Sequence, residues 1–150
     1  MCYFYSVNNL LKMNDKEKLD LLNSMTKNTL METLDIQYTK IGADFLVATM
    51  PVNEKVHQPM GLLHGGASVA FAESVASPAS LLFVDPEKNE VRGIEITANH
   101  LRTKRSGLLT ATAKIIHKGK MTHLWEIRIE DEKGNLISLC KLTNIIIPRK

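Results

Sequence analysis

The sequence is poor in cysteine and has only a small excess of basic residues. Its two cysteines, Cys2 and Cys140, lie at opposite ends of the 150 residues and match neither a metal-ligand spacing nor a disulfide framework. We therefore expect no metal site and a reducing, cytoplasmic location. Nineteen basic residues against 16 acidic ones give a formal charge of +3, too little to predict a nucleic-acid ligand, although a local anionic ligand remains open.

Long apolar runs are also missing. No segment approaches the roughly 20 consecutive apolar residues of a membrane span, so no membrane association is expected. Residues 1–11 lack the basic leader and the long apolar stretch of a secretory signal. We expect residues 1–13 to be an N-terminal extension and residues 14–150 to form a single domain, a length that suits one hydrophobic core.

The first half of the chain predicts one helix followed by a hairpin. Leucine and methionine recur every three to five residues between residues 14 and 33, which indicates an amphipathic helix with Asn14 or Asp15 as its cap. Residues 34–39 and 44–50 are typical of two strands, the second ended by Pro51. Residues 53–63 carry Asn, Gln, Pro and Gly and indicate a loop.

The second half predicts a buried helix and a sheet. Residues 65–83 are rich in Ala and Ser and apolar nearly all round, as in a helix that a sheet wraps closely. Residues 91–104, 108–117, 122–130 and 136–147 alternate like strands, and residues 131–135 indicate a tight turn. About six strands with mostly short connections and one central helix predict an α+β fold with a largely antiparallel sheet.

Glu73 is the candidate catalytic residue, because an ionised carboxylate on an Ala-rich, buried helix must be paired or must serve a purpose. A structural pairing with a core hydroxyl or a basic side chain is the alternative. His64, Gly65 and Gly66 precede the same helix, where free backbone N–H groups and the helix dipole favour an oxyanion. The alternative for the two glycines is a helix start that merely permits close packing.

The spacing of these residues constrains how they act. Glu73 lies nine residues after His64, and a rise of 1.5 Å per residue separates them by roughly 13 Å on one helix. One chain therefore cannot bring both to the same carbonyl group. If both act on one substrate, the helix of a second subunit must run antiparallel alongside, which gives two equivalent sites per symmetric dimer.

The motifs of this chain resemble those of the hotdog-fold thioesterases of the phenylacetate-pathway type. The resemblance covers about residues 28–147 and is carried by Gln58, Gly61–Val69 and Ala72–Ser74, then by Gly93–Arg102, Trp125–Ile129 and Asp131–Gly134. Within that family, the motifs look closest to those of the 1,4-dihydroxy-2-naphthoyl-CoA hydrolases and the thioesterases of enterobactin synthesis. Pro78 departs from the family pattern, where a small or aliphatic residue is usual, and it changes the expected shape of the substrate pocket.

The resemblance implies a hotdog fold, which is a long central helix wrapped by a curved antiparallel sheet, assembled as homodimers that pair into homotetramers. It implies hydrolysis of an acyl-CoA, with an aromatic acyl group favoured and no separate cofactor. Residues matching Glu73 act as nucleophile or general base, and the N–H of Gly65 stabilises the oxyanion. Residues matching Gln58 and His64 orient the thioester, and the one matching Ser77 positions the carboxylate or the water.

The resemblance also implies a coenzyme A site. Its residues are Gly93, Asn99, His100, Leu101, Arg102, Thr103, His117, Lys118, Gly119 and Lys120. Judged without the resemblance, the basic run after Leu101 is typical of a solvated strand end. A hotdog domain that senses acyl-CoA without hydrolysing it is the main alternative function, and the joint presence of Gln58, His64 and Glu73 argues against it. A hydratase on the same fold would need an Asp and His arrangement that is not found.

Overall fold

The structure, a computed structural model, describes residues 12–149, so Cys2 and nearly all of the expected extension at 1–13 lie outside the described residues. Helices α2 (Asp15–Ser24) and α3 (Leu30–Thr33) come first, followed by β1 (Gln37–Ile41) and β2 (Phe45–Val52). A 3-10 turn η2 (Glu54–Val56), the short strands β3 (His57–Gln58) and β4 (Leu62–Leu63) and helix α4 (Gly65–Leu81) follow. Strands β5 (Asn89–His100), β6 (Gly107–Lys118), β7 (Thr122–Asp131) and β8 (Leu136–Pro148) complete the chain.

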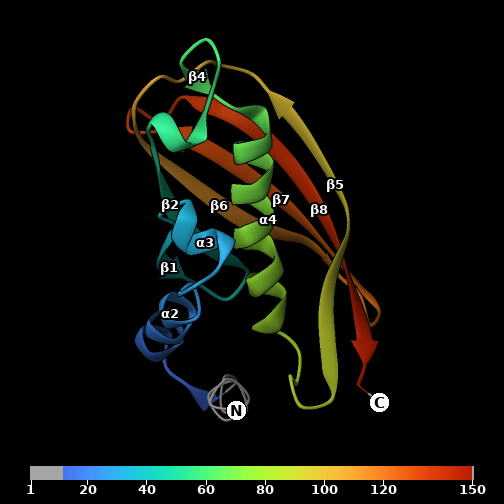
Figure 1. Cartoon of the computed structure of the whole chain (residues 1–150). Helices are drawn as coiled ribbons and strands as arrows, with labels where there is room; N and C mark the ends of the chain where they lie inside the picture. Colours follow the sequence, from blue (N-terminus) through green and yellow to red (C-terminus); the bar gives the residue numbers. More distant parts are fainter. Residues whose placement is uncertain (1–11, 150) are drawn as a thin grey trace.

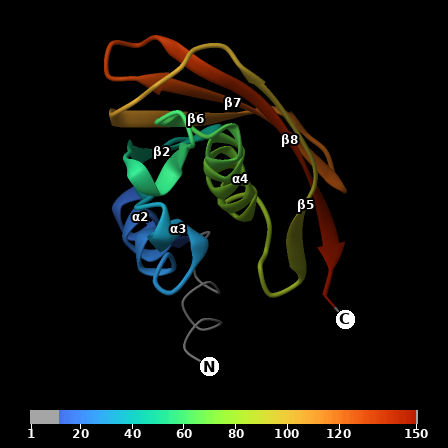
Figure 2. The same cartoon turned by 45° about the horizontal axis from the view of Figure 1, so that its top comes forward.

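One curved antiparallel sheet wraps a central helix, which confirms the predicted α+β class and architecture. The strand order in the six-stranded sheet is β1-β2-β6-β7-β8-β5, and every neighbouring pair is antiparallel. Figure 1 shows α4 running along the sheet and α2 and α3 beside its β1–β2 end, and Figure 2 shows the sheet arching over α4. Strand β5, twelve residues long, forms the opposite edge and pairs only with β8 among the described strands.

The prediction of one helix over residues 14–33 was wrong, because α2 and α3 are separate. Asn14 does cap α2, through a capping box in which its side chain accepts from the Glu17 N–H while the Glu17 carboxylate accepts from the Asn14 N–H. Beyond Ser24 the chain turns, and Asn28 takes a left-handed conformation with φ 60°, which a continuous helix does not allow. Leucine periodicity continued across this break, which is why the pattern looked like one helix.

Two further predictions in this region need correction. Pro51 does not end the second strand: β2 continues to Val52, with Pro51 opposite Leu108 of β6. Pairing with β1 stops at Thr49, so the missing N–H of Pro51 falls where β2 needs no donor on that side. The expected loop at 53–63 contains η2 and the small β3–β4 hairpin.

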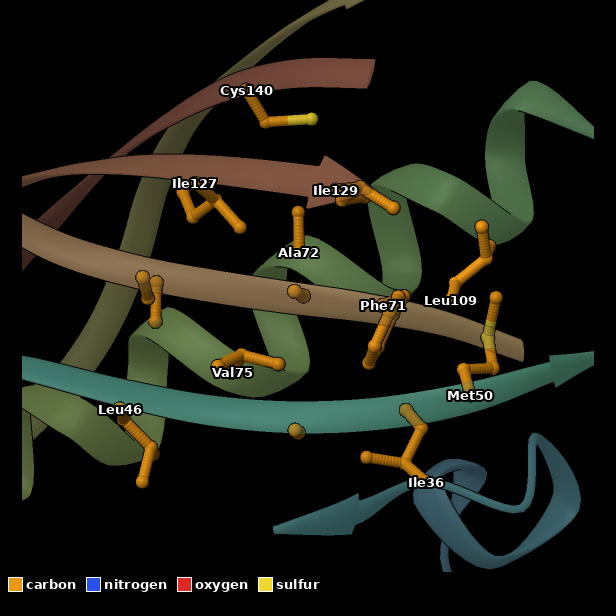
Figure 3. Close-up of a cluster of buried hydrophobic side chains, with 14 of the residues drawn as sticks. Ile36, Leu46, Met50, Phe71, Ala72, Val75, Leu109, Ile127, Ile129 and Cys140 are labelled. Carbon is orange, nitrogen blue, oxygen red and sulfur yellow. The ribbon is translucent and has the colours of Figure 1, made fainter. Parts of the chain in front are cut away.

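The core lies between α4 and the concave face of the sheet (Figure 3). From the helix come Phe71, Ala72 and Val75, all fully buried, and opposite them lie large side chains such as Leu46 and Ile127. Fully buried alanines on the sheet, at positions 48, 111 and 113, leave room for the helix. This small-residue contact explains why an Ala- and Ser-rich segment forms the central helix.

One face of α4 is nevertheless open, and this corrects the prediction of a helix that is buried all round. Gly66 and Glu73 are exposed, and Val69, Ala70 and Ser77 are only half-buried. These positions recur every three or four residues and so lie along one stripe of the helix. Glu73 therefore stands on the uncovered stripe of the single chain rather than in its core.

Pro78 lies inside α4 without breaking it. A proline has no N–H, so the carbonyl four residues earlier, that of Ser74, loses its helical donor. The hydroxyl of Tyr38 donates to that carbonyl at 2.6 Å. A strand residue thus supplies the hydrogen bond that Pro78 removes, which keeps the helix continuous to Leu81.

This substitution of one donor for another can be tested by a double-mutant cycle. Tyr38→Phe should lower the free energy of unfolding by about 1–3 kcal/mol, because it leaves a buried carbonyl without a donor. In a Pro78→Ala background, the restored N–H can serve Ser74, and the same change should cost well under about 1 kcal/mol. Urea unfolding of the four proteins measures both costs, and equal costs in the two backgrounds would contradict the assignment.

Candidate active site

The N-terminus of α4 is capped by His64. Its Nδ1 accepts the N–H of Gly66 at 2.8 Å, so Nε2 is the ring nitrogen that can donate. The His64 side chain is exposed and can donate from Nε2. The Gly65 N–H donates to no acceptor within residues 12–149. This donor at the positive end of the helix is therefore available to a ligand.

A cavity of about 340 Å³ lies beside this helix end. It brings together Gln58, Gly65 and the segment 100–103, which the family resemblance had assigned to orienting the thioester, to the oxyanion and to coenzyme A. The other lining residues are Leu62, Leu63, Ser68, Ile137 and Ser138. The Gln58 side-chain oxygen accepts from the Met60 N–H at 2.5 Å, which leaves its NH₂ group as the donor for a ligand.

His100 closes one side of this cavity. Its Nδ1 lies 3.0 Å from the hydroxyl of buried Ser138. On its other side, a Cβ built on Gly65 would lie 2.7 Å from the His100 Nε2. Only glycine at 65 therefore lets the imidazole approach the start of the helix this closely. Asn99, at the end of β5, is exposed next to it.

Glu73 occupies a different cavity, of about 360 Å³, together with Ser77. Its carboxylate lies against the backbone of Gly93 on β5, where a Cβ would come within 2.8 Å of the Glu73 Oε1. One helical turn away, the Ser77 hydroxyl donates to the Oδ1 of buried Asn144 at 3.4 Å. Gly93 thus lies with Glu73 in this chain and not with the segment 99–103.

The two cavities share no lining residue. Gly65 and Glu73 stand eight residues apart on one continuous helix, about 12 Å along its axis. One chain consequently holds the candidate oxyanion donors at one place and the carboxylate at another, as the spacing in the sequence required.

The remaining predicted coenzyme A residues lie elsewhere on the sheet. Lys118, Gly119 and Lys120 line a cavity of about 670 Å³ at the turn between β6 and β7, and His117 is exposed just before them. Strand register places Lys118 level with Gly93, seven residues from His100 along β5, which is about 23 Å. A single chain does not bring the two basic segments together.

The electrostatics of that turn favour anions at its surface. Lys118 stacks over the Phe83 ring, with Nζ 4.8 Å from the ring centroid. His123, nearly fully buried beneath, has its pKa lowered by burial and by the charges of Lys118 and His117. It is therefore neutral at physiological pH, and the positive charge stays on the exposed lysines.

Lys104 and Arg105, which follow Leu101 in the basic segment, stabilise the fold and do not line the cavity. Lys104 is largely buried and pairs with Asp131, at 3.9 Å, and with Glu132. Arg105 donates to the backbone carbonyls of Met60 and Gly61 and so holds the β3–β4 turn. Arg102 also donates to a carbonyl, but its side chain stays exposed at the cavity rim.

Cys140 is unsuited to act as a nucleophile. It lies fully inside the core, and burial raises the pKa of its thiol to about 11. A thiol reacts as the thiolate, so Cys140 is inert near neutral pH. Within residues 12–149, no group of three or more His, Cys, Asp or Glu side chains is placed to hold a metal ion.

Known proteins resemble the chain over most of its length. The family described as "Thioesterase superfamily" matches residues 60–138. A 1,4-dihydroxy-2-naphthoyl-CoA hydrolase of Escherichia coli is 45% identical over 132 residues, covering 88% of this chain and 96% of that protein. The proofreading thioesterase EntH of Cronobacter turicensis is 41% identical, covering 86% of this chain and 93% of its own.

This chain belongs to the thioesterase superfamily. Its fold agrees: the crystal structure of a mutant thioesterase from Pseudomonas aeruginosa superposes with a TM-score of 0.86 at 44% identity, covering 87% of this chain and 94% of that one. The resemblance recognised in the motifs is thereby confirmed, and the chain is a thioester hydrolase of hotdog fold. No helix that the structure describes is long and apolar enough to cross a membrane.

Sequence reasoning missed three residues that position the site of this thioesterase. Ser138 and Asn144 bond to His100 and Ser77, and Tyr38 supports the helix at Ser74. Ser138 and Asn144 share one face of β8 with buried Cys140 and Leu142. Polar residues at inward positions of an alternating strand were the available signal, because a buried polar group needs a partner.

The contact between Gly93 and Glu73 gives a test of this geometry. Gly93→Ala adds a methyl group that would lie 2.8 Å from the Glu73 Oε1, so the carboxylate must move. We expect kcat for thioester hydrolysis to fall about 10- to 100-fold.

A matched glycine serves as the control. At Gly134, in the β7–β8 turn, an added methyl group would meet no atom within 4 Å, but the residue has a φ of +78°. Gly134→Ala should therefore cost stability and not activity. A Gly93→Ala protein that keeps the wild-type kcat would show that the carboxylate position is not needed.

Proposed function

We propose that this thioesterase hydrolyses acyl-CoA, favouring an aromatic acyl group, at two sites that form between the subunits of a homodimer. Glu73 of one subunit acts on a thioester whose carbonyl oxygen is held by Gly65, His64 and Gln58 of the other. The names of the relatives, a naphthoyl-CoA hydrolase and a proofreading thioesterase, support the substrate class. Dimers that pair into tetramers are part of the same proposal.

The single observation that carries the proposal is the open stripe of α4. Exposed Glu73 lies on this stripe and the free Gly65 N–H lies at the start of the same helix, too far apart to meet within one chain. A second α4, antiparallel to the first, would place each Glu73 opposite the other chain's Gly65 and cover both stripes. Strand β5 supports this arrangement, because its Gly93 lies against Glu73 on the open stripe and its outer edge pairs with no other described strand, which would leave it open to aggregation.

The chemistry follows from the groups so assembled. The Gly65 N–H, the His64 Nε2–H and the Gln58 NH₂ donate to the thioester oxygen and stabilise the negative charge that develops there. The Glu73 carboxylate either adds to the carbonyl, forming an anhydride that water then hydrolyses, or removes a proton from an attacking water. In both cases the C–S bond breaks, and the products are the free acid and the thiol of coenzyme A. Ser77, held by Asn144, lies one turn from the carboxylate to position the water.

Coenzyme A would span both subunits in this arrangement. Lys118 stands level with Gly93, and therefore with Glu73, along the sheet. The antiparallel pairing of helices brings that level of one subunit toward the Gly65 and His100 end of the other. Arg102 and Thr103 of one chain and His117–Lys120 of its partner would then form one cationic rim for the phosphates.

Mixed dimers test whether the site is shared. Glu73→Ala and Gln58→Ala should each reduce kcat at least about 100-fold as homodimers. Co-expression in equal amounts gives about half heterodimers, each with one doubly mutated site and one intact site. The mixture should therefore recover about a quarter of wild-type activity in a free-thiol release assay.

A site formed within one chain predicts a different result for the mixture. If Gln58 and Glu73 of the same chain formed each site, every heterodimer site would carry one mutation, and the mixture would stay inactive. Purification with a different tag on each subunit, followed by mass measurement, establishes that heterodimers are present before activity is compared.

A further inference from the structure

A buried chain of hydrogen bonds runs from the core to Ser77 on the open stripe of α4. The Nε1–H of Trp125 on β7 donates to the Oγ of Ser80 at 2.8 Å. The Nδ2 group of Asn144 on β8 donates to the same Oγ at 2.8 Å and to the carbonyl of Ala76 at 3.2 Å. The Oδ1 of Asn144 accepts from the Ser77 hydroxyl at 3.4 Å. Trp125, Ser80 and Asn144 are fully buried, whereas Ser77 is only half-buried.

The direction of each bond in this chain follows from the groups at its ends. An indole N–H can only donate and a backbone carbonyl can only accept. The Asn144 atom that lies against the Ala76 carbonyl must therefore be the amide nitrogen, so the amide oxygen faces Ser77. An amide oxygen cannot donate, so the Ser77 hydroxyl must supply its single proton to Asn144. Within residues 12–149, that oxygen has no other donor and that hydroxyl has no other partner.

The Ser77 oxygen is consequently available to a ligand only as an acceptor. It cannot donate to the carboxylate of Glu73, which lies one turn earlier and lines the same cavity. The carboxylate is turned toward this end of the chain, since a Cβ built on Gly93 would lie 2.8 Å from the Glu73 Oε1 and 3.7 Å from the Asn144 Oδ1. Residues four apart on a helix have Cβ atoms about 5–6 Å apart. One water can span such a gap by donating a hydrogen to each oxygen, which leaves its lone pair free to attack a carbonyl carbon.

We infer that Asn144 is a positioning residue: it holds the proton of Ser77, so that Ser77 and Glu73 together orient the attacking water. This inference rests on the proposed function. It decides between the two roles that the family resemblance allows Ser77, because a hydroxyl without a free proton can orient water but cannot hold the carboxylate. As Glu73 takes one proton from the water, the new C–O bond forms and the C–S bond breaks. The proton then passes from Glu73 to the departing sulfur, which gives the free acid and the thiol. In the covalent route, the same water hydrolyses the anhydride.

A double-mutant cycle on kcat tests whether Asn144 acts through Ser77. Asn144→Leu keeps the branched shape of the side chain without its oxygen, and Ser80 retains its bond from Trp125. Ser77→Ala and Asn144→Leu should each lower kcat about tenfold or more and change KM less than about twofold, because the water is misplaced while the substrate contacts remain. The double variant should be no slower than Ser77→Ala, because Asn144 then has no hydroxyl to position. The substrate is the best member of a panel of aryl- and alkanoyl-CoAs.

Asn23→Leu is the matched control. Asn23 on α2 also makes two hydrogen bonds through its amide, both with the backbone of Tyr38, at 2.9 and 2.8 Å. It lines none of the three cavities described above. This variant should lower the free energy of unfolding and leave kcat within about twofold of the wild-type value. Asn144→Ala replaces Asn144→Leu if the leucine variant does not fold, and each kcat is taken per mole of protein shown to be folded by circular dichroism.

The outcomes separate the two proposals. A wild-type kcat in the Asn144 variant, or losses that multiply in the double variant, would overturn the positioning role while the hydrolase itself stands. No hydrolysis of any member of the panel by the wild-type protein, or hydrolysis that survives Glu73→Ala, would overturn the proposed function instead.

Discussion

The rigid length of helix α4 is the constraint on which the rest of the site depends. Gly65 begins the helix and Glu73 stands more than two turns later, so no side-chain rotation can bring the carboxylate to the free N–H at the helix start. The stripe of the helix that carries Glu73 is not covered by the rest of the chain. A catalytic arrangement that uses both groups therefore requires a second helix, and covering the stripe is what a second helix would do.

The core explains how α4 can be both buried and exposed. Small residues on the sheet let the helix sink into the concave face, and Phe71 and Val75 fill the space that remains. The residues of the proposed site lie on the other side and at the start of the helix, and strand residues contact them: Gly93 contacts Glu73, His100 contacts Gly65 and Asn144 contacts Ser77. In the proposed site, the helix supplies the reactive groups and the strands determine where they lie.

Pro78, a departure from the family pattern, affects residues outside its own helix. It removes one N–H, Tyr38 supplies the replacement, and both residues become part of the wall of the Glu73 cavity. A single hydrogen bond thus connects the N-terminal hairpin with the continuity of the helix beside the Glu73 cavity.

Much of the fold was predictable from the sequence, because alternation and small-residue composition report directly on which faces are buried. The four long C-terminal strands and the central helix lie within a few residues of their predicted positions. The break between α2 and α3 was not predictable from leucine spacing, since it depends on a left-handed Asn28. Continuation of β2 through Pro51 depended on knowing where β1 ends.

The site was predictable in part. Spacing along one helix was enough to separate Gly65 from Glu73, and the motifs identified the candidate residues. The exposure of Glu73 was not predictable, because an Ala-rich helix has the same composition whether the sheet or a second subunit covers it. The partners Ser138 and Asn144 come from β8, more than 60 residues away from Ser77 in the case of Asn144, and such long-range pairs leave only the weak signal of an inward polar residue.

The molecular mass of the active protein tests the central claim most directly. Sedimentation at the concentration used for the activity assay should give at least twice the chain mass of 16.8 kDa, and specific activity should fall on dilution as subunits separate. A species of 16.8 kDa that hydrolyses thioesters at the undiluted rate would contradict a site shared between two chains.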